Sequence, residues 1–350
     1  MFDGSVGFIR RVMPKAGAAE LRTVLAVAAV AIVLGAVSVP SGSLGATSTI
    51  SQLSTPQTLK TSGEPFAIAI DPGSGRAYVT DAKENTLFVF DLASGGAVAF
   101  VPTGRQPNHV VLSGTRAFVS NFTDASITVI DTSTNQPVKN LSVGGLGLAV
   151  NPATGRLYAA GGSRVSVLDT TTSALIATIA APAGANIWGL AVDPVANRLY
   201  ATDIANPRVL VYDGATNKLI GEVAIDAPAR FGIAIGAAGR VFVASYTDRS
   251  PQLFTIDALS AKVIARTPIA AFTASLLSDP LAGVVYASSG VDRSVTAINT
   301  SIGGTSRVAL TQTPGGLGIN PITSALIVVT PGGVAPPLRR PSDGAVVTKP

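Results

Sequence analysis

The sequence lacks cysteine altogether, and among its 350 residues it has a single histidine, a single tryptophan and only four glutamates. Without cysteine, the chain can form no disulfide, thiolate metal site, cysteine nucleophile or lipid-modified N-terminal cysteine. A single histidine excludes multi-histidine copper and zinc centres. Any Ser-His-Asp catalysis would have to use His109, and no G-x-S-x-G nucleophile motif is present.

Charged residues are also scarce, at 13% of the chain, and they are not gathered into a binding surface. Seven of the 25 basic and three of the 20 acidic residues lie in the first 40 residues or after Val334. The body between these ends keeps 18 basic and 17 acidic residues and is therefore nearly neutral. This balance excludes the concentrated basic surface of a nucleic-acid-binding protein.

One long apolar run lies near the N-terminus, at residues 23–39 (TVLAVAAVAIVLGAVSV). Basic residues precede it, and Pro40 with a stretch of small residues follows, which is the pattern of an export signal. Its 17 residues are at the lower limit for spanning a bilayer, so residues 1–46 are interpreted as a signal peptide or an N-terminal membrane anchor. We expect the rest of the chain to be exported, to the periplasm, the cell surface or the medium.

The remainder of the chain repeats itself. The phrases AYVTD, AFVSN, LYATD and VYASS begin at residues 77, 117, 199 and 285. Their aromatic position falls 40 to 44 residues apart, at Tyr78, Phe118, Tyr158, Tyr200, Phe242 and Tyr286. An Asx-Pro pair lies seven residues before four of them, and each is followed by an apolar run that ends in Asp or Asn. These landmarks predict six copies of one structural unit.

Each copy is interpreted as four short antiparallel strands. The first is small and apolar, as in FAIAI and GIAI, and the Asx-Pro pair turns it over. The aromatic phrase forms the second strand, an alternating run such as ITVID the third, and a segment such as PVKNLSV the fourth. A four-stranded unit of about 40 residues is a β-propeller blade, which buries its faces only against neighbouring blades.

The two ends of the repeat region predict a seventh blade. After Asn320-Pro321 the pattern restarts and places Ile327 at the aromatic position, but the proline-rich segment that follows cannot supply two further strands. Residues 47–63 resemble the missing third and fourth strands. We therefore expect a seven-bladed, all-β propeller over residues 47–332, with its last blade built from both ends of the chain, and a disordered tail at 333–350.

These phrases also resemble the YVTN repeat of bacterial and archaeal exported β-propellers. The resemblance covers roughly residues 47–332, and it departs from the pattern at LYAAGG, around Tyr158. It implies an exported propeller, but it does not imply one activity, because such repeats occur in surface proteins, periplasmic binding proteins and fused enzyme domains.

The recurring carboxylates are expected to form turns. Asp favours turns because its side chain accepts backbone N–H groups. This interpretation covers Asp71, Asp193 and Asp279 at the Asx-Pro turns, and Asp91, Asp131, Asp169, Asp213 and Asp257 at the later turns.

The residues that break the repeat are the candidates for a binding site. Propeller ligands usually sit at one mouth of the central channel, in the loops that lead from each fourth strand to the next first strand. Those loops are predicted to bring together Glu64, Arg105, Asn108, His109, Asn186, Trp188, Asp226 and Arg230, with Phe231 beside them. Two arginines, a carboxylate, amides and an indole suit an anionic or sugar-like ligand. The alternative is that these side chains only satisfy the loop backbone and fill the channel.

Three functions remain open at this stage. The first is a non-catalytic module at the cell envelope that binds a small molecule, a glycan or an envelope protein, without a cofactor, as a monomer that contacts the membrane only through its N-terminal segment. The second is a divalent-ion-dependent hydrolase or lactonase, with Ca²⁺ held by oxygens of the kind that Glu64, Asn108, Asn186 and Asp226 offer. The third is a purely structural surface protein.

Overall fold

A computed structural model describes residues 56–301, 303–332, 338–339 and 346–347. The expected export segment at 1–46, the first part of the expected closing segment at 47–55 and most of the tail lie outside the described residues. Within the described ranges, no helix is long and apolar enough to cross a membrane. Two short strands of the tail, β28 (Leu338–Arg339) and β29 (Val346–Val347), pair with each other.

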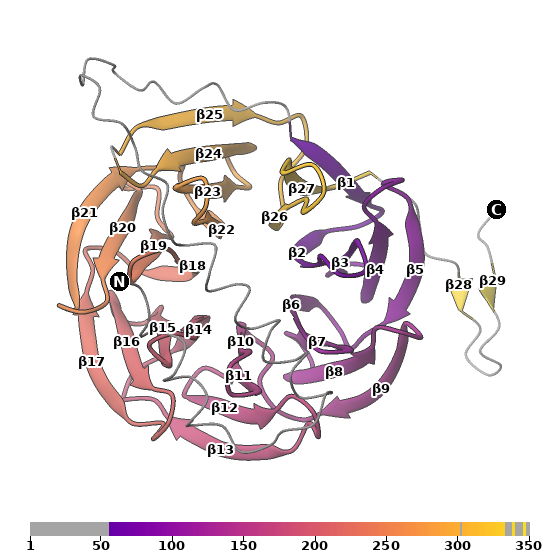
Figure 1. Ribbon diagram of the computed structural model, residues 1–350, viewed down its shortest axis with the longest axis horizontal. Coiled ribbons are helices and arrows are strands. Elements are labelled where there is room, and N and C mark those ends of the chain that lie inside the picture. Colours follow the sequence, from indigo (N-terminus) through magenta and orange to yellow (C-terminus); the bar gives the residue numbers. More distant parts are fainter. Residues whose placement is uncertain (1–55, 302, 333–337, 340–345, 348–350) are drawn as a thin grey trace, which may run out of the picture. The chain divides into compact units, whose positions relative to one another are not determined.

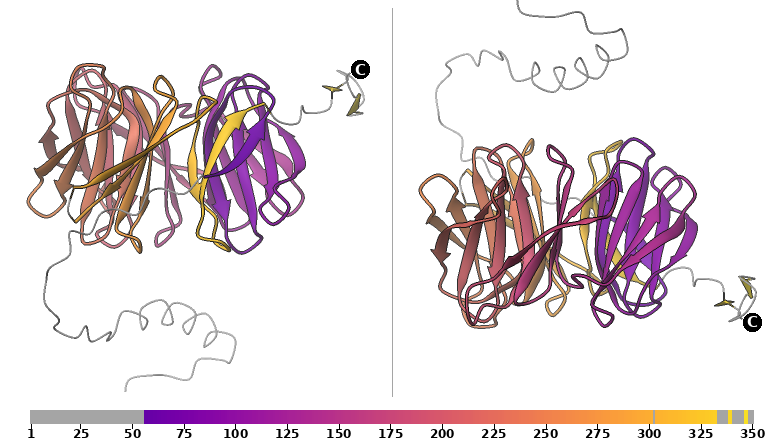
Figure 2. Two further views of the ribbon diagram at one scale, coloured as in Figure 1. Left: turned by 90° about the horizontal axis from the view of Figure 1, so that it is seen from above. Right: turned by 90° about the horizontal axis from the view of Figure 1, so that it is seen from below.

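Six blades follow one another along the chain and stand around a central axis (Figures 1 and 2). Each is a four-stranded antiparallel sheet whose strands pair in sequence order, with the first strand innermost. Blade 1 contains β2 (Pro65–Asp71), β3 (Arg76–Asp81), β4 (Thr86–Asp91) and β5 (Ala97–Pro102). Blade 2 contains β6 (Pro107–Ser113), β7 (Arg116–Asn121), β8 (Ser126–Asp131) and β9 (Gln136–Leu141). Blade 3 contains β10 (Leu148–Asn151), β11 (Arg156–Ala160), β12 (Arg164–Asp169) and β13 (Leu175–Ala180).

The next three blades repeat this arrangement. Blade 4 contains β14 (Ile187–Asp193), β15 (Arg198–Asp203), β16 (Arg208–Asp213) and β17 (Leu219–Ala224). Blade 5 contains β18 (Ala229–Ile235), β19 (Arg240–Ser245), β20 (Gln252–Asp257) and β21 (Lys262–Pro268). Blade 6 contains β22 (Thr273–Asp279), β23 (Val284–Ser289), β24 (Ser294–Asn299) and β25 (Thr305–Ala309).

The seventh blade joins both ends of the repeat region, which confirms the predicted closure. β26 (Leu317–Ile319) and β27 (Leu326–Pro331) form its inner part, and β1 (Gln57–Thr61) pairs with β27 (Figure 1). One detail differs from the other blades, because β1 lies directly beside the second strand and runs parallel to it. Leu59 is suited to this place, since it buries its side chain with Ile327, Val329 and the core of blade 1.

The ring has two different faces. The chain enters every innermost strand from the same side, which also carries the turns between second and third strands, and we call this side the junction face. The opposite side carries the Asx-Pro turns and the turns between third and fourth strands, and we call it the turn face. β1 starts at the turn face and ends at the junction face, because Gln57 pairs with Ile327 and Thr61 with Pro331.

The fourth residue of the repeated phrase links neighbouring blades. The Thr80 hydroxyl accepts the N–H of Ala67 in its own blade (3.0 Å) and donates to the carbonyl of Asn108 in the next (3.0 Å). Thr202 and Ser288 donate to the next blade in the same way. A small hydroxyl therefore recurs because it satisfies backbone groups that two converging strands leave unpaired.

Blade 3 lacks this hydroxyl, and its backbone compensates. Ala160 stands at the equivalent position, and the N–H of Gly147 donates directly to the carbonyl of Trp188 in blade 4, at 2.9 Å. A Cβ at Gly147 would collide with that same carbonyl. This close approach explains the glycine in VGGLGLA, a segment that superficially resembles a dinucleotide-binding loop.

The recurring carboxylates at the turn face form turns, as predicted. Asp213 accepts the N–H groups of Ala215 and Thr216, at 3.2 and 2.7 Å, and Asp193 accepts that of Val195 at 2.9 Å. Hydrogen bonds from the hydroxyl and the backbone N–H of Thr216 hold the pKa of Asp213 below its usual value. The same two kinds of hydrogen bond lower the pKa of Asp91, Asp131, Asp169 and Asp257.

Candidate functional site

The innermost strands present one aliphatic residue per blade to the channel. Each of these residues pairs with the residue that follows the aromatic position of the phrase, so they share one register. All seven line one cavity, and we call them the collar: Ile68, Val110, Leu148, Leu190, Ile233, Leu276 and Leu317.

The residues two positions before the collar are of very different sizes. Blades 1, 4 and 5 carry the aromatic residues Phe66, Trp188 and Phe231, whereas blades 6 and 7 carry Ala274 and Gly315. The channel is therefore filled from one side and left open on the other. This asymmetry would create a cavity even in a ring of identical backbones.

The aromatic side chains meet across the channel. The ring of Phe231 in blade 5 contacts Phe66 of blade 1 edge-on, with centroids 5.4 Å apart, and the imidazole of His109 in blade 2 at 4.8 Å. Phe66 and His109 also contact each other, at 5.7 Å. Blade 5 is not a neighbour of blade 1 or blade 2, so these three rings form a wall inside the ring.

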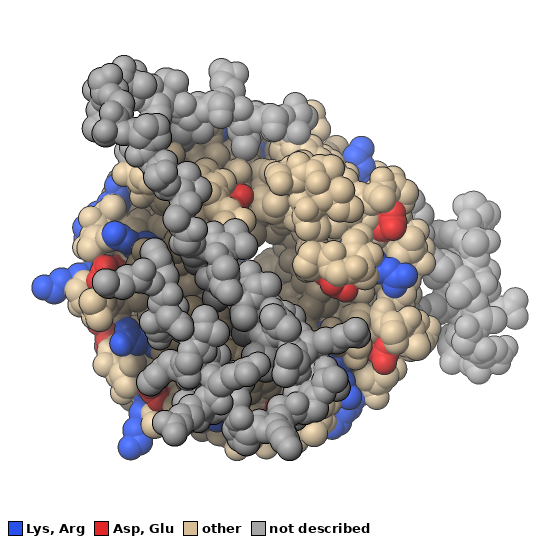
Figure 3. Space-filling view, viewed as in Figure 1, with Lys and Arg blue, Asp and Glu red and all other residues tan. Residues whose placement is uncertain are grey.

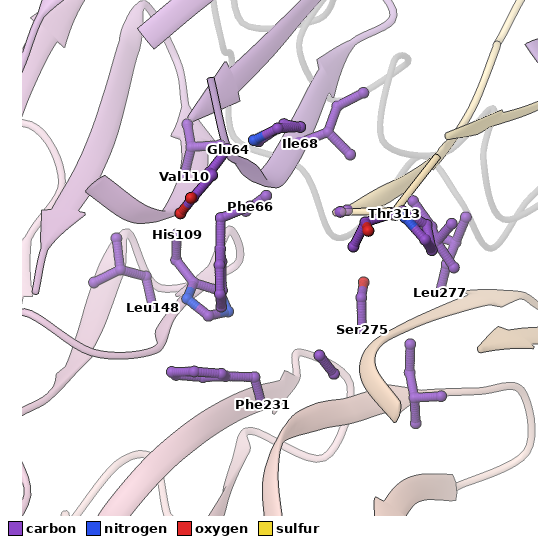
Figure 4. A pocket seen from close by; sticks show the side chains of 18 of the residues that line it. Glu64, Phe66, Ile68, His109, Val110, Leu148, Phe231, Ser275, Leu277 and Thr313 are labelled. Carbon is purple, nitrogen blue, oxygen red and sulfur yellow. The ribbon is translucent and has the colours of Figure 1, made fainter. Parts of the chain in front are cut away.

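A cavity of about 640 Å³ lies beside this wall. Phe66, His109 and Phe231 stand on one side of it, and Ser275, Leu277 and Thr313 stand on the other (Figure 4). Glu64, Pro314 and Pro331 also line it, and all three lie at the junction face. The volume falls in the range of small-molecule pockets, and the mainly apolar lining with a few polar groups is typical of them.

His109 is the titratable group inside the wall. Part of its ring faces the cavity, whereas Nδ1 is sealed from solvent and has no hydrogen-bond partner. Burial lowers the pKa of His109 to about 4, because the charged imidazolium is poorly solvated there. The imidazole is therefore neutral at neutral pH and can offer a hydrogen bond to a bound molecule without carrying charge.

Arg230 lies behind the wall, between two aromatic rings. Its guanidinium carbon is 4.2 Å from the centre of the Trp188 ring and 4.9 Å from that of Tyr246. Its Nη1 donates to the Tyr246 hydroxyl at 3.2 Å, while the Trp188 Nε1 donates to the Asn186 side chain at 3.0 Å. These contacts fix Trp188 against Phe231, with centroids 5.2 Å apart, and so support the wall from outside the cavity.

The eight predicted site residues are thus not all in one place. Glu64 and His109 line the cavity, and Asn186, Trp188 and Arg230 support its wall. Arg105 forms an ion pair with Asp124 at 2.6 Å, and Asp226 forms one with Arg266 at 2.6 Å, both on exposed surface. Asn108 is buried, and its carbonyl accepts the inter-blade bond from Thr80.

Of the four oxygen-bearing residues suggested for Ca²⁺, only Glu64 lines the cavity. Within the part of the chain that the structure describes, no group of three His, Cys, Asp or Glu side chains is placed to hold a metal ion. Figure 3 shows one face of the ring, where the visible charged residues are scattered singly among uncharged ones.

The sequence interpretation missed the residues that leave the cavity open. Ala274, Ser275, Gly315 and Gly316 are small and carry no recognisable chemistry. An alignment of the seven innermost strands by register would have revealed two of them, because Ala274 and Gly315 stand where other blades have Phe66, Trp188 and Phe231.

Comparisons with known proteins give the same architecture. The fold is similar to a chain in the crystal structure of a mitotic checkpoint complex, with a TM-score of 0.68 and 14% identity, covering 85% of this chain and 95% of that one. It is also similar to a chain of Kuenenia stuttgartiensis hydrazine synthase, with a TM-score of 0.66 and 15% identity, covering 82% and 99%. No family model and no curated protein matches. The chain is therefore a seven-bladed β-propeller, and both its description as WD40-like and its membership of the YVTN-repeat family stay predictions.

Proposed function

We propose that this protein is an exported, non-catalytic binding module that takes a small, largely apolar molecule into the cavity at its junction face. The single observation that carries the proposal is the cavity of about 640 Å³ between the wall and blades 6 and 7. Its collar supplies apolar contact from all seven blades, and Glu64, His109, Ser275 and Thr313 supply a few polar contacts. The propeller fold itself suits an interaction module, because it holds loops from different blades on a rigid ring.

The arrangement favours binding over catalysis. The only imidazole is neutral and packs against the rings of Phe66 and Phe231, and it forms no ion pair with a carboxylate of the described residues. A general base needs a partner that orients it and a pKa near the working pH. The predicted export through residues 23–39 supports a role at the cell envelope.

A titration with the fluorescent dye anilinonaphthalene sulfonate tests the cavity. We expect saturable binding of one dye per chain in the wild-type protein. Ser275→Phe, which places a ring in the cavity, should weaken this binding at least tenfold. Val291→Phe is the matched control, because residue 291 lies in the same blade and on the same face but on an exposed turn. Equal binding by both variants would place the dye elsewhere and reject the cavity as the site.

Catalysis is tested separately, on the same protein. Turnover of lactones or glycosides that requires Ca²⁺ and is abolished by Glu64→Ala would replace the proposal with the hydrolase alternative. If Ca²⁺ gives no heat of binding in calorimetry and no hydrolysis follows, that alternative is rejected.

A further inference from the structure

The turns of the turn face carry few charged residues between their strand ends. Thirteen connections lie on each face of the ring. The described turns of the turn face contain one charged residue, Lys218, whereas the loops of the junction face contain ten. The other charged residues of the turn face lie at the strand ends that flank these turns, so the tips of the turns are left to uncharged side chains.

Aliphatic side chains stand at the tips of these turns. Leu281 is 99% exposed, Val195 97%, Leu259 90% and Ile322 67%. They belong to blades 6, 4, 5 and 7, so they form one arc over four consecutive blades. We call these four residues the apolar tips. Single exposed aliphatic residues are ordinary, but an arc of nearly fully exposed ones marks an interaction surface.

Three of these tips stand on the same kind of turn. Val195, Leu281 and Ile322 each follow an Asx-Pro pair, at the same position of the turn. The Asp193 carboxylate accepts the N–H of Val195 at 2.9 Å, and the Asn320 side chain accepts that of Ile322 at 2.9 Å. The equivalent residues in blades 1 and 3 are Gly73 and Ala153. The turn itself therefore does not require a large side chain.

The chain enters the ring at this same face and beside this same arc. The Asn320 Nδ2 donates to Gln57 Oε1 at 2.9 Å, which fixes the start of β1 next to the turn that carries Ile322. The apolar run predicted to be an export signal or anchor ends at residue 39, so only 17 residues lie between it and Gln57. If that run stays in the membrane, the chain that leaves the bilayer enters the ring at the turn face.

We propose that the turn face rests on the surface of a lipid bilayer, with the apolar tips inserted among the headgroups. This goes beyond a contact through the N-terminal segment alone. It rests on the proposed export, with residues 1–46 retained as an uncleaved membrane anchor. It places the cavity at the junction face, on the side of the ring that points away from the membrane and toward solutes.

The charges near this face indicate what kind of binding to expect. At the strand ends and turns of the turn face, eight aspartates oppose five arginines and two lysines: Asp71, Asp91, Asp131, Asp169, Asp193, Asp213, Asp257 and Asp279 against Arg76, Arg116, Arg156, Arg198, Arg240, Lys218 and Lys262. Several of these arginines bind the next blade, as Arg198 does through the carbonyl of Ala258 at 2.7 Å. Such a balanced face has little net attraction for anionic lipids. Contact should therefore depend on apolar insertion and respond weakly to salt.

The test uses the full chain in vesicles of phosphatidylethanolamine and phosphatidylglycerol. Because the chain has no cysteine, Leu281→Cys and Ile322→Cys each place one environment-sensitive fluorophore at one tip. Val291→Cys is the control, since residue 291 is also 67% exposed but lies on the junction face. Phospholipids that carry a nitroxide quencher should reduce the fluorescence at residues 281 and 322 several-fold more than at residue 291. Raising the salt concentration should leave this difference unchanged.

Three results would overturn the proposal. Equal quenching at residues 281 and 291 in vesicle-bound protein rejects contact between the tips and the bilayer, while the anchor stands. A blue-shifted label at residue 281 without lipid, together with a dimer in light scattering, means that a second copy covers the tips. Failure of the full chain to associate with vesicles rejects both the anchor and the bilayer contact. None of these results changes the dye titration, so the cavity proposal is judged independently.

Discussion

The two faces of the ring are made by the same strands, yet they carry different connections. The junction face holds ten charged loop residues, the aromatic wall and the mouth of the cavity, whereas the turn face holds the apolar tips at its turns and nearly all of its charged residues at the flanking strand ends. The strands between them follow one repeated pattern. The difference teaches that the repeat specifies the blade, and that the specific properties lie where one copy departs from the next, in the connections and at the first residues of the innermost strands.

Turn length explains part of this contrast. The Asx-Pro turns are short, and their backbone N–H groups donate to the side chain of the Asp or Asn that begins the turn, so each offers little more than one side chain to its surroundings. The loops of the junction face are longer in places, as at residues 310–316, and they converge on the channel. A face made of tight turns suits a flat contact, and a face made of converging loops suits a pocket.

The largest expected effect concerns ring closure, on which both faces depend. Leu59→Asp should lower the free energy of unfolding by about 4 kcal/mol or more, because it buries an unpaired carboxylate between blades 7 and 1. Lys60→Asp, on the exposed side of the same strand, should change it by less than about 0.5 kcal/mol. Urea unfolding of both variants makes the comparison. If Leu59→Asp lowers the free energy of unfolding as little as Lys60→Asp does, β1 does not close the ring.

The two faces can be compared directly within blade 4, through one aspartate on each. Asp203 is buried at the junction face, where it accepts the N–H groups of Asn186 and Ala205 and the Nε of Arg208. Asp203→Ala should cost about 3 kcal/mol, because several buried donors lose their partner. Asp213 forms a partly exposed turn, so Asp213→Ala should cost about 1 kcal/mol. If urea unfolding shows that Asp213→Ala lowers the free energy of unfolding more than Asp203→Ala does, the turn-face aspartate contributes more to stability than the junction-face one, contrary to this expectation.

The pH dependence of stability tests whether His109 is buried in the wall of the junction face. The pKa of His109 is lowered by burial from 6.5 to about 4, so the unfolded chain binds the proton more tightly than the folded one. The stability from neutral His109 is fully present above pH 6.5 and is lost as the pH falls toward 4. We expect wild type to lose about 2 kcal/mol more than His109→Phe across this window, allowing for the partly exposed ring. If wild type and His109→Phe show the same dependence of stability on pH in thermal unfolding, His109 is exposed to water.

The smallest expected effect is at the turn face. Leu281→Ser should change the free energy of unfolding in solution by less than about 0.5 kcal/mol, because the side chain contacts almost nothing within the ring. A loss above about 1 kcal/mol would show that the tips serve the fold, since surface residues without such a role rarely cost as much.

The sequence predicted the ring more completely than the site. Landmarks repeated from Tyr78 to Tyr286 gave the blades, and the incomplete copy at Asn320 gave the closure. The position of β1 beside β27 could not be foreseen, because strand pairing depends on which segment best covers a buried partner. Leu59 and Thr61 cover β27 well, whereas the alignment with other blades placed this segment in the fourth position.

The site was harder to predict, because the sequence does not show which residues pair with the charged residues of the loops. Arg105 and Asp226 belong to the loops expected at the mouth, but Asp124 and Arg266 hold them on the outer surface. His109 and Trp188 stood out as unique residues, and the structure places both in or against the wall. The cavity itself depends on small side chains, and these form no recognisable sequence motif.

The central claim is that the missing side chains of blades 6 and 7 leave an open apolar cavity in the channel. Crystals pressurised with xenon test it most directly, because xenon occupies apolar cavities and is located by its anomalous scattering. The account predicts a xenon peak between Phe231 and Ser275, inside the collar, and its loss in Ser275→Phe. A channel collapsed onto the wall, with no xenon among the seven aliphatic residues, would contradict it.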